Sequence, residues 1–209
     1  YQGTSSSNMI GVGSKIKCRR YSSPLLLFII VFGCVFHNLY ILLQHDFPLG
    51  VDGYYYVVQI DHFLAHKGFY YPTFTPVVLI LSSGIAGLGV GSALASKIVS
   101  SLLYAGLATA VFLSIKELTK SPWLGIVGMI VVVLSDLRQV WIIEFVNNLG
   151  GITFLMIGSF FFRKRIRRKL DVLIGSSFLI IAVFSHKSIF PLICVFVTTY
   201  ALFVGLSRI

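Results

Sequence analysis

Seven apolar stretches, separated by short polar segments, fill most of this chain and restrict what it can fold into. They are Pro24–Leu43, Thr73–Gly91, Leu94–Ile115, Trp123–Leu134, Trp141–Phe162, Val172–Phe184 and Ser188–Leu206. A membrane-spanning helix needs about 20 such residues. Hydrophobic residues make up 56% of the 209 residues and charged residues only 11%, whereas a soluble domain has about 25% charged residues. The sequence therefore predicts an all-α, polytopic transmembrane helix bundle.

One loop between these stretches is strongly basic. Six of the seven residues in Arg163–Lys169 are Arg or Lys, and only Ile166 is uncharged. Moving one such residue to the centre of a bilayer costs about 2.5–3.5 kcal/mol, and basic loops stay on the cytoplasmic side. The sequence thus predicts a cytoplasmic loop here. The net charge of +10 comes from basic residues at the ends of apolar stretches rather than on a soluble domain, which argues against a nucleic-acid partner.

The basic loop also limits the number of crossings. If the amino end is cytoplasmic and every stretch crosses, Arg163–Lys169 falls on the outer side, against the charge rule. One earlier stretch is therefore expected not to cross. Thr73–Gly91 is the best candidate, because it holds four glycines and each glycine lowers helix stability by about 1 kcal/mol. A broken or re-entrant segment here leaves about six spans. Alternatively, Trp123–Phe162 crosses only once, which places Lys116 and Lys120 outside.

The expected organisation follows from this topology. Residues 1–23 form a cytoplasmic tail, in which one interpretation takes Met9 as the natural start and Tyr1–Asn8 as a non-native extension. Residues 24–206 form the bundle, and the first apolar stretch is read as a retained span because it is too long for a cleaved signal sequence. We expect an integral membrane protein with a cytoplasmic amino terminus. Its location would be the plasma membrane of a prokaryote or the endoplasmic reticulum of a eukaryote.

The first outer loop, residues 44–72, carries a polar stripe. A helix that begins near Asp52 would have one polar and one apolar face and would lie along the membrane surface. Its polar face consists of Asp52, Tyr55, Gln59, His62 and His66. Asp52 lies between Gly50 and Gly53, so it either only caps this helix, with the stripe in solvent, or belongs to a functional site. His62 and His66 have the spacing of a metal-binding pair but lack a third clear ligand.

Several segments occur in an order that is typical of one family. They are the short tail with the first span, the Gly–x–Asp–Gly–Tyr–Tyr–Tyr stretch at residues 50–56, Leu64–Val78 with its glycine and prolines, the small-residue stretch Leu94–Leu118, the polar patch Glu144–Asn148 and the Lys-containing turn Ser185–Ser188. In this combination the chain resembles the GT-C superfamily of integral-membrane glycosyltransferases, of the type that depends on polyprenyl-phosphate sugars. The resemblance covers the amino-terminal half of such enzymes.

The resemblance implies a chemistry for the outer loops. Such enzymes pass a sugar from a polyprenyl-phosphate carrier to an acceptor at the outer face, with a loop carboxylate as general base or metal ligand and cationic groups at the lipid phosphate. By position, Asp52 is the implied catalytic carboxylate. Candidate binding residues for the lipid phosphate or the acceptor are Lys187, His186, Arg138, Glu144, Tyr55 and His66. Glu144 or Asp136 is also a candidate second acid, and the participation of a divalent cation is left open.

Two other functions compete with this one. The chain could be a non-catalytic membrane subunit that packs against a partner supplying the missing half, since small residues at Gly84–Gly87 and Ala93–Ser101 favour helix contacts in lipid. It could also be a small transporter, because broken helices build substrate sites. The absence of an internal repeat and of a carboxylate near the centre of a span argues against the transporter.

Overall fold

The computed structural model of the chain describes residues 22–46, 50, 52–73, 76–143, 145–163 and 169–206. Within these residues the chain consists of helices and turns, with no strand, which confirms the all-α prediction. The helices are α1 (Ser22–Leu42), α2 (Gly53–His66), α3 (Val77–Ala86), α4 (Ser92–Thr119), α5 (Pro122–Leu134), α6 (Leu137–Ile143), α7 (Val146–Arg163), α8 (Lys169–Ser185) and α9 (Ile189–Leu206). Most of the predicted tail, Glu144 and most of the basic loop lie outside the described residues.

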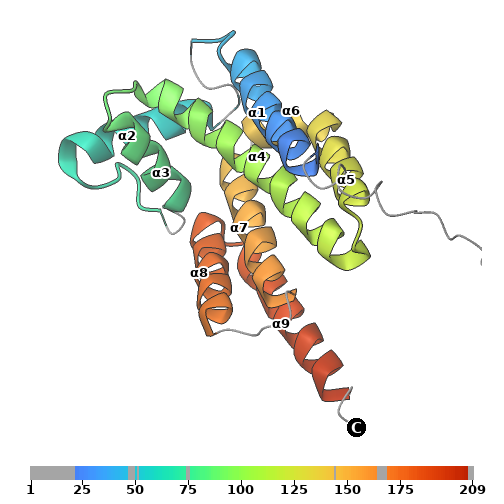
Figure 1. Ribbon diagram of the computed structural model, residues 1–209. Helices are drawn as coiled ribbons and strands as arrows, with labels where there is room; N and C mark the ends of the chain where they lie inside the picture. The colour runs from blue at the N-terminus through green and yellow to red at the C-terminus, as the bar shows by residue number, and fades with distance from the viewer. Residues whose placement is uncertain are drawn as a thin grey trace, which may run out of the picture.

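The longest helix, α4, lies at the centre of the molecule. It packs against α1, α2, α3, α5, α6 and α7, and Figure 1 shows α1 and α5 on one side of it and α2 and α3 near its first turns. These contacts are possible because the buried face of α4 is rich in small residues, which let neighbouring backbones approach closely. The buried small residues are Ala95, Ser96, Ser100, Ser101, Ala105, Ala108, Ala110 and Ser114.

Side-chain contacts fix the direction of each helix. Tyr104 of α4 donates a hydrogen bond to the Val132 carbonyl late in α5, whereas Phe112 lies against Gly125 early in α5, so the two helices are antiparallel. Similar contacts make α1 antiparallel to α4, α7 parallel to α4, and α8 antiparallel to α7. One end of the bundle therefore holds α2, α3, α6 and the turn between α8 and α9; we call it the α2 end. The opposite end holds the turn between α4 and α5.

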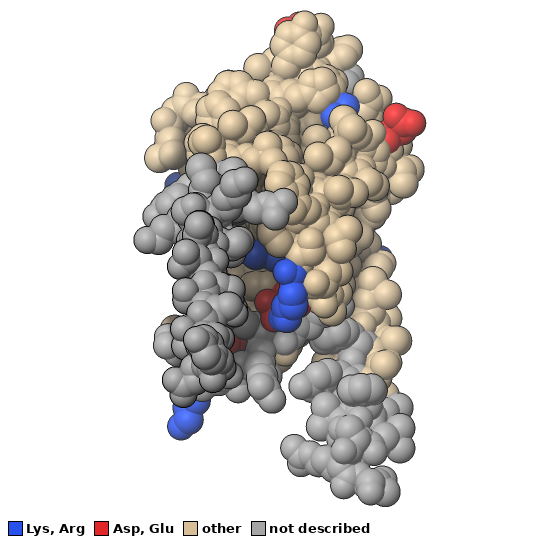
Figure 2. All heavy atoms as spheres, turned by 45° about the vertical axis from the view of Figure 1, so that its right-hand side comes forward, with Lys and Arg blue, Asp and Glu red and all other residues tan. Residues whose placement is uncertain are grey.

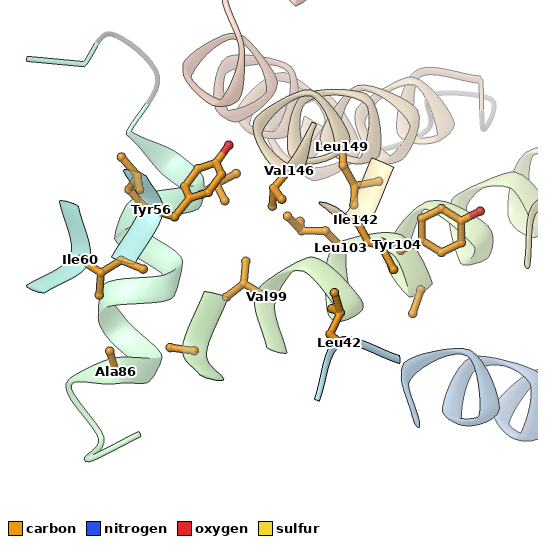
Figure 3. Close-up of a cluster of buried hydrophobic side chains, with 14 of the residues drawn as sticks. Leu42, Tyr56, Ile60, Ala86, Val99, Leu103, Tyr104, Ile142, Val146 and Leu149 are labelled. Carbon is orange, nitrogen blue, oxygen red and sulfur yellow. The ribbon is translucent and has the colours of Figure 1, made fainter. Parts of the chain in front are cut away.

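A buried apolar cluster joins the helices at the α2 end. Figure 3 shows side chains from α1, α2, α4, α6 and α7 that converge on one region. They include Leu42, Tyr56, Ile60, Val99, Leu103, Ile142, Val146 and Leu149. Ile60 and Leu149 have no exposed surface at all. The cluster also includes Val78, Leu79 and Ala86 of α3 and so draws on six helices, which fixes α2 and the start of α7 against the first half of α4.

The helices differ in how well they suit a bilayer. Among the described residues, only α1, over Pro24–Leu42, and α4 are long and apolar enough by themselves to cross a membrane. Helices α5 and α6 meet the same requirement together, as one span bent by 67°, which raises the number to three. On the face shown in Figure 2, the described charged side chains are few and scattered over a neutral surface. The structure supports a membrane protein, but with fewer clear spans than the six expected.

Two interruptions shape the α2 end. The stretch Thr73–Gly91, expected to be broken or re-entrant, contains α3, which has only 10 residues and is about 15 Å long, half the thickness of a hydrocarbon core. Gly89 follows it with a φ of +91°. The bend between α5 and α6 was not expected from the sequence. The range Trp123–Phe162 contains α5, α6 and α7, and α7 begins at the α2 end.

Candidate functional site at the α2 end

The turn that leads into α2 exposes Asp52. The backbone N–H of Gly53 donates to the carbonyl of Gly50 at 3.2 Å, and Gly50 has a φ of +95° that favours glycine. Asp52 occupies the position before the first helical residue, but its side chain makes no capping hydrogen bond within the described chain and is exposed to solvent. The carboxylate is therefore not used to cap α2, and it stands beside the positive end of the helix dipole.

Tyr56 lies one turn beyond Asp52 and points into the bundle. Its side chain is buried, and it forms a hydrogen bond with the backbone of Asn147 at the start of α7. Burial raises the pKa of the Tyr56 phenol far above its usual value, and the nearby charge of Asp52 acts in the same direction. Tyr56 is thus a neutral phenol that ties the Asp52 turn to α7. Its neighbour Tyr55 was the candidate predicted from the sequence. The ring of Tyr55 is half-buried and stacks on that of Tyr71, with 6.1 Å between the centroids.

Lys97 is the second buried polar residue that the sequence analysis did not place in the site. Its side chain is 4% exposed in α4. Its Nζ donates to the backbone carbonyls of His45 and Asp46, the latter at 3.2 Å. Lys97 and Tyr56 line a common small cavity of about 10 Å³, enough for roughly one water molecule. A sequence signal existed, because Lys97 is a lone charge inside a small-residue apolar stretch.

The first turn of α7 contributes two asparagines. The Oδ1 atoms of Asn147 and Asn148 are buried and have no hydrogen-bond partner among the described residues. Buried amide oxygens without partners are rare in folded proteins, so this turn has unused hydrogen-bonding capacity. Glu144, which precedes it, lies outside the described residues.

Two glycines bring the turn between α8 and α9 onto the same part of α7. A Cβ at Gly151 would lie 3.3 Å from the Cβ of His186, and one at Gly150 would lie 2.7 Å from Val78 of α3. His186 is half-buried and accepts a hydrogen bond from the Ser188 N–H at 3.3 Å. Burial, and then the charge of exposed Lys187, lower the pKa of His186. Since Asn147 and Gly151 are four residues apart on α7, Tyr56 and His186 contact the same helix face.

The predicted polar stripe of α2 is used differently from what its pattern suggested. Gln59 has no exposed surface and makes two hydrogen bonds with the Tyr71 backbone, at 3.2 and 3.3 Å. The Nδ1 of His62 lies 2.8 Å from the Gly68 carbonyl oxygen. The stripe therefore holds residues 68–71 against α2 rather than facing solvent along its length. This aromatic segment returns beside the helix, and Phe69 stacks on Phe63.

His66 lies at the far end of α2 from Asp52. The fourteen residues of α2 correspond to about 21 Å of helix, so His66 does not belong to the group around Asp52. Its ring packs against that of His62, with centroids 4.4 Å apart. Within the described residues, no three His, Cys, Asp or Glu side chains are close enough together to hold a metal ion.

Arg138 is in a separate polar group at the bend between α5 and α6. Its Nη1 donates to the Val133 carbonyl at 3.1 Å, and Tyr104 donates to the preceding carbonyl, that of Val132. Arg138 thus satisfies a carbonyl group at the end of α5, and Tyr104 adds a second donor to the Val132 carbonyl, which also accepts from the Ser135 N–H at 3.2 Å. The Nε of Arg138 is buried and has no partner in the described part of the chain. The contacts of Arg138 are thus with the helix break, and no recorded contact joins it to Asp52.

Comparison with known proteins gives no relative. No protein-family model, no curated protein and no solved structure matches the chain. Function is therefore argued from the geometry of the α2 end. This geometry joins Asp52, Tyr56, Asn147 and His186 through α7, with Lys97 beneath the first turn of α2 and Lys187 exposed beside His186.

Proposed function

We propose that the protein is a membrane glycosyltransferase, or the module of one, that transfers a sugar from a polyprenyl-phosphate carrier to an acceptor at the α2 end. The observation that carries the proposal is the exposed Asp52 carboxylate, which sits at a helix start without serving as its cap. A carboxylate that is accessible from solvent is suited to accept a proton from an acceptor hydroxyl, or to hold a metal ion beside it.

Nearby groups support the binding of an anionic carrier. Lys187 supplies an exposed cation in the turn that packs on α7, and neutral His186 supplies a hydrogen-bonding group next to it. A cation in this position stabilises the negative charge that a departing lipid phosphate develops. The first turn of α7 adds the buried Oδ1 atoms of Asn147 and Asn148, which accept no hydrogen bond from the described residues and have the capacity to accept one from a hydroxyl of the sugar or the acceptor.

A lateral groove supports a lipid-linked donor. It has a volume of about 450 Å³, within the range of known small-molecule sites, and it is formed by α1, α4, α7 and α8. Its lining is almost entirely apolar and includes Val35, Leu102, Leu113, Ile157, Phe160 and Phe178. Because α4 and α7 run parallel away from the α2 end, a chain that lies between them with its phosphate directed toward that end would bring the phosphate to the site. The proposed occupant is the polyprenyl chain.

The proposal counts the shorter apolar helices as membrane helices and places the α2 end outside. Helices α7, α8 and α9 have 18, 17 and 18 residues, or about 25–27 Å each, against about 30 Å of hydrocarbon. With α1, α4 and the bent α5–α6 pair they would make six crossings. The basic residues after α7 would then be cytoplasmic, as the charge rule requires.

The hypothesis of a non-catalytic membrane subunit has less support from the structure than from the sequence. One of its reasons was the small-residue run Ala93–Ser101, but six residues of this run are buried inside the bundle, against the chain's own helices: Ala95, Ser96, Lys97, Val99, Ser100 and Ser101. Gly84 remains open, since no described atom lies within 4 Å of a Cβ built there. One open glycine is a weak basis for a partner interface.

A transfer assay tests the proposal. Membranes that contain the wild-type protein or Asp52→Asn would be supplied with a panel of radiolabelled polyprenyl-phosphate sugars. Loss of a general base costs about 10²- to 10⁴-fold in rate, so we expect a loss of that size in Asp52→Asn. Asp171→Asn is the matched control, because Asp171 lies in the first turn of α8 at the opposite end. Equal transfer by wild type and Asp52→Asn, or no transfer by the wild type from any donor, contradicts the proposal.

A further inference from the structure

Lys97 is a lysine that is buried without a carboxylate partner. Its side chain is 4% exposed, and no ion pair with an acidic side chain is formed by it within the described residues. A buried ammonium group is costly unless hydrogen bonds replace its water. Lys97 obtains two of them from backbone carbonyl oxygens, those of His45 and Asp46. Both acceptors belong to the segment that connects α1 to the Asp52 turn.

Lys97 lies close to both ends of the segment that connects α1 to α2. Leu42, the last residue of α1, and Gly53, the first of α2, line the same small cavity as Lys97. Asp46 lies only six residues before Asp52. An ammonium bound to two consecutive carbonyls therefore holds the connection at a point close to the carboxylate. Hydrogen bonds from a charged donor are about twice as strong as neutral ones, which suits a contact that must immobilise a loop.

We infer that Lys97 is a positioning residue: it holds the segment around His45 and Asp46 against α4 and thereby fixes where Asp52 stands. The conclusion that this contact positions a catalytic group rests on the proposed function of Asp52. The contact between Lys97 and the two carbonyls is independent of that function. Lys97 does not act on the substrate, because its side chain is buried and its donors face the backbone of its own chain.

The first arm of the test measures the loop without any substrate. A nitroxide label would be attached at Gln44→Cys, an exposed position next to His45, in a full-length background whose native cysteines are replaced by alanine. We expect the electron paramagnetic resonance spectrum to become more mobile in Lys97→Met, which keeps the side-chain length but has no donor. Lys97→Arg, which keeps the charge and the donors, should restore most of the ordered spectrum. An unchanged spectrum in Lys97→Met overturns the inference.

Lys67→Met is the matched control for this arm. Lys67 is also a lysine of the α2 end, but it is exposed and reaches only the Leu64 carbonyl of its own helix, at 3.5 Å. Its loss should leave the spectrum at Gln44→Cys unchanged, and an equal effect of both lysine variants overturns the inference. If Lys97→Met gives no folded protein, Lys97→Gln replaces it, because its amide keeps the site polar but carries no charge and ends one bond short of the lysine ammonium, so that it should hold the two carbonyl oxygens much less tightly. A spectrum of Lys97→Gln as ordered as that of the wild type again overturns it.

The second arm measures transfer. Misplacement of a reacting group by about 1 Å can cost 10²-fold in rate, so we expect kcat to fall by about 10- to 100-fold in Lys97→Met with KM little changed, and Lys97→Arg to recover most of it. A mobile loop with unchanged kcat overturns the positioning role. If the wild type transfers no sugar, the proposed function fails, and the spectra alone still decide whether Lys97 holds the loop.

Discussion

Gly151 offers a sharp test of how the turn between α8 and α9 sits on α7. Replacing it with alanine puts a Cβ 2.6 Å from Cγ1 of Ile189, 3.2 Å from its Cδ1 and 3.3 Å from the Cβ of His186. Carbon atoms pack at about 3.5–4.0 Å, so the first contact is too short by about 1 Å. Ile189 is 3% exposed and has little room to move away. The turn that carries His186 must therefore shift.

The size of the effect follows from a matched pair of variants. Overpacking a buried site costs about 1–3 kcal/mol. Gly→Ala inside a helix also contributes about 0.5–1 kcal/mol of stability, and this gain is shared by Gly84→Ala in α3, where no described atom lies within 4 Å of the new Cβ. The difference between Gly151→Ala and Gly84→Ala thus isolates the clash. At about 2–4 °C per kcal/mol for a chain of this size, Gly151→Ala should melt about 2–12 °C below Gly84→Ala.

The assay is thermal unfolding of both purified variants in the same detergent at one heating rate, because membrane proteins often unfold irreversibly. Gly84→Ala should melt at or above the temperature of the wild type. A melting temperature for Gly151→Ala equal to or above that of Gly84→Ala would refute the close packing of this turn on α7, and with it the placement of His186 and Lys187 beside the start of that helix.

Two further predictions concern the same end of the bundle. Gln59→Leu removes two hydrogen bonds to the Tyr71 backbone, which are worth about 0.5–1.5 kcal/mol each. Amide exchange at Tyr71, measured by mass spectrometry, should therefore accelerate about 5- to 150-fold, whereas exposed Gln139→Leu should leave it unchanged. Unchanged protection of the Tyr71 amide in Gln59→Leu would contradict the role of Gln59 in holding residues 68–71 against α2. The pKa of His186 is lowered from 6.5 in the folded protein, so as the pH falls below 6.5 the unfolded state takes up the proton first and stability decreases. The melting temperature of the wild type should therefore drop more between pH 7.5 and pH 5 than that of His186→Gln, and parallel curves would contradict the lowered pKa.

Local patterns in the sequence predicted the local structure well. The glycines around Asp52 indicated a turn that leads into a helix, and α2 begins at Gly53 and ends before Gly68. The glycine-rich stretch Thr73–Gly91 indicated a segment too broken to cross, and α3 is a helix of 10 residues. In each case the determining interactions lie within a few residues of one another, so the sequence contains the necessary information.

Features that depend on distant contacts were not predicted. Gln59 was placed on the polar face of α2, but the sequence did not indicate its partner, the backbone of Tyr71, which is twelve residues away on a segment that returns beside the helix. Lys97 received no role from the sequence, because the carbonyls that receive its hydrogen bonds lie about fifty residues earlier. Helical periodicity reports which residues share a face, but it does not report what covers that face.

The account as a whole depends on the two ends of the bundle lying on opposite sides of a membrane. Tyr54, 68% exposed at the α2 end, and Lys120, exposed in the turn between α4 and α5, are suitable positions for single cysteines. In sealed, oriented vesicles, a membrane-impermeant maleimide should label Tyr54→Cys from the outer side only and Lys120→Cys only after the membrane is opened. Labelling of both cysteines from the same side of the intact membrane would contradict the topology and the proposed site together.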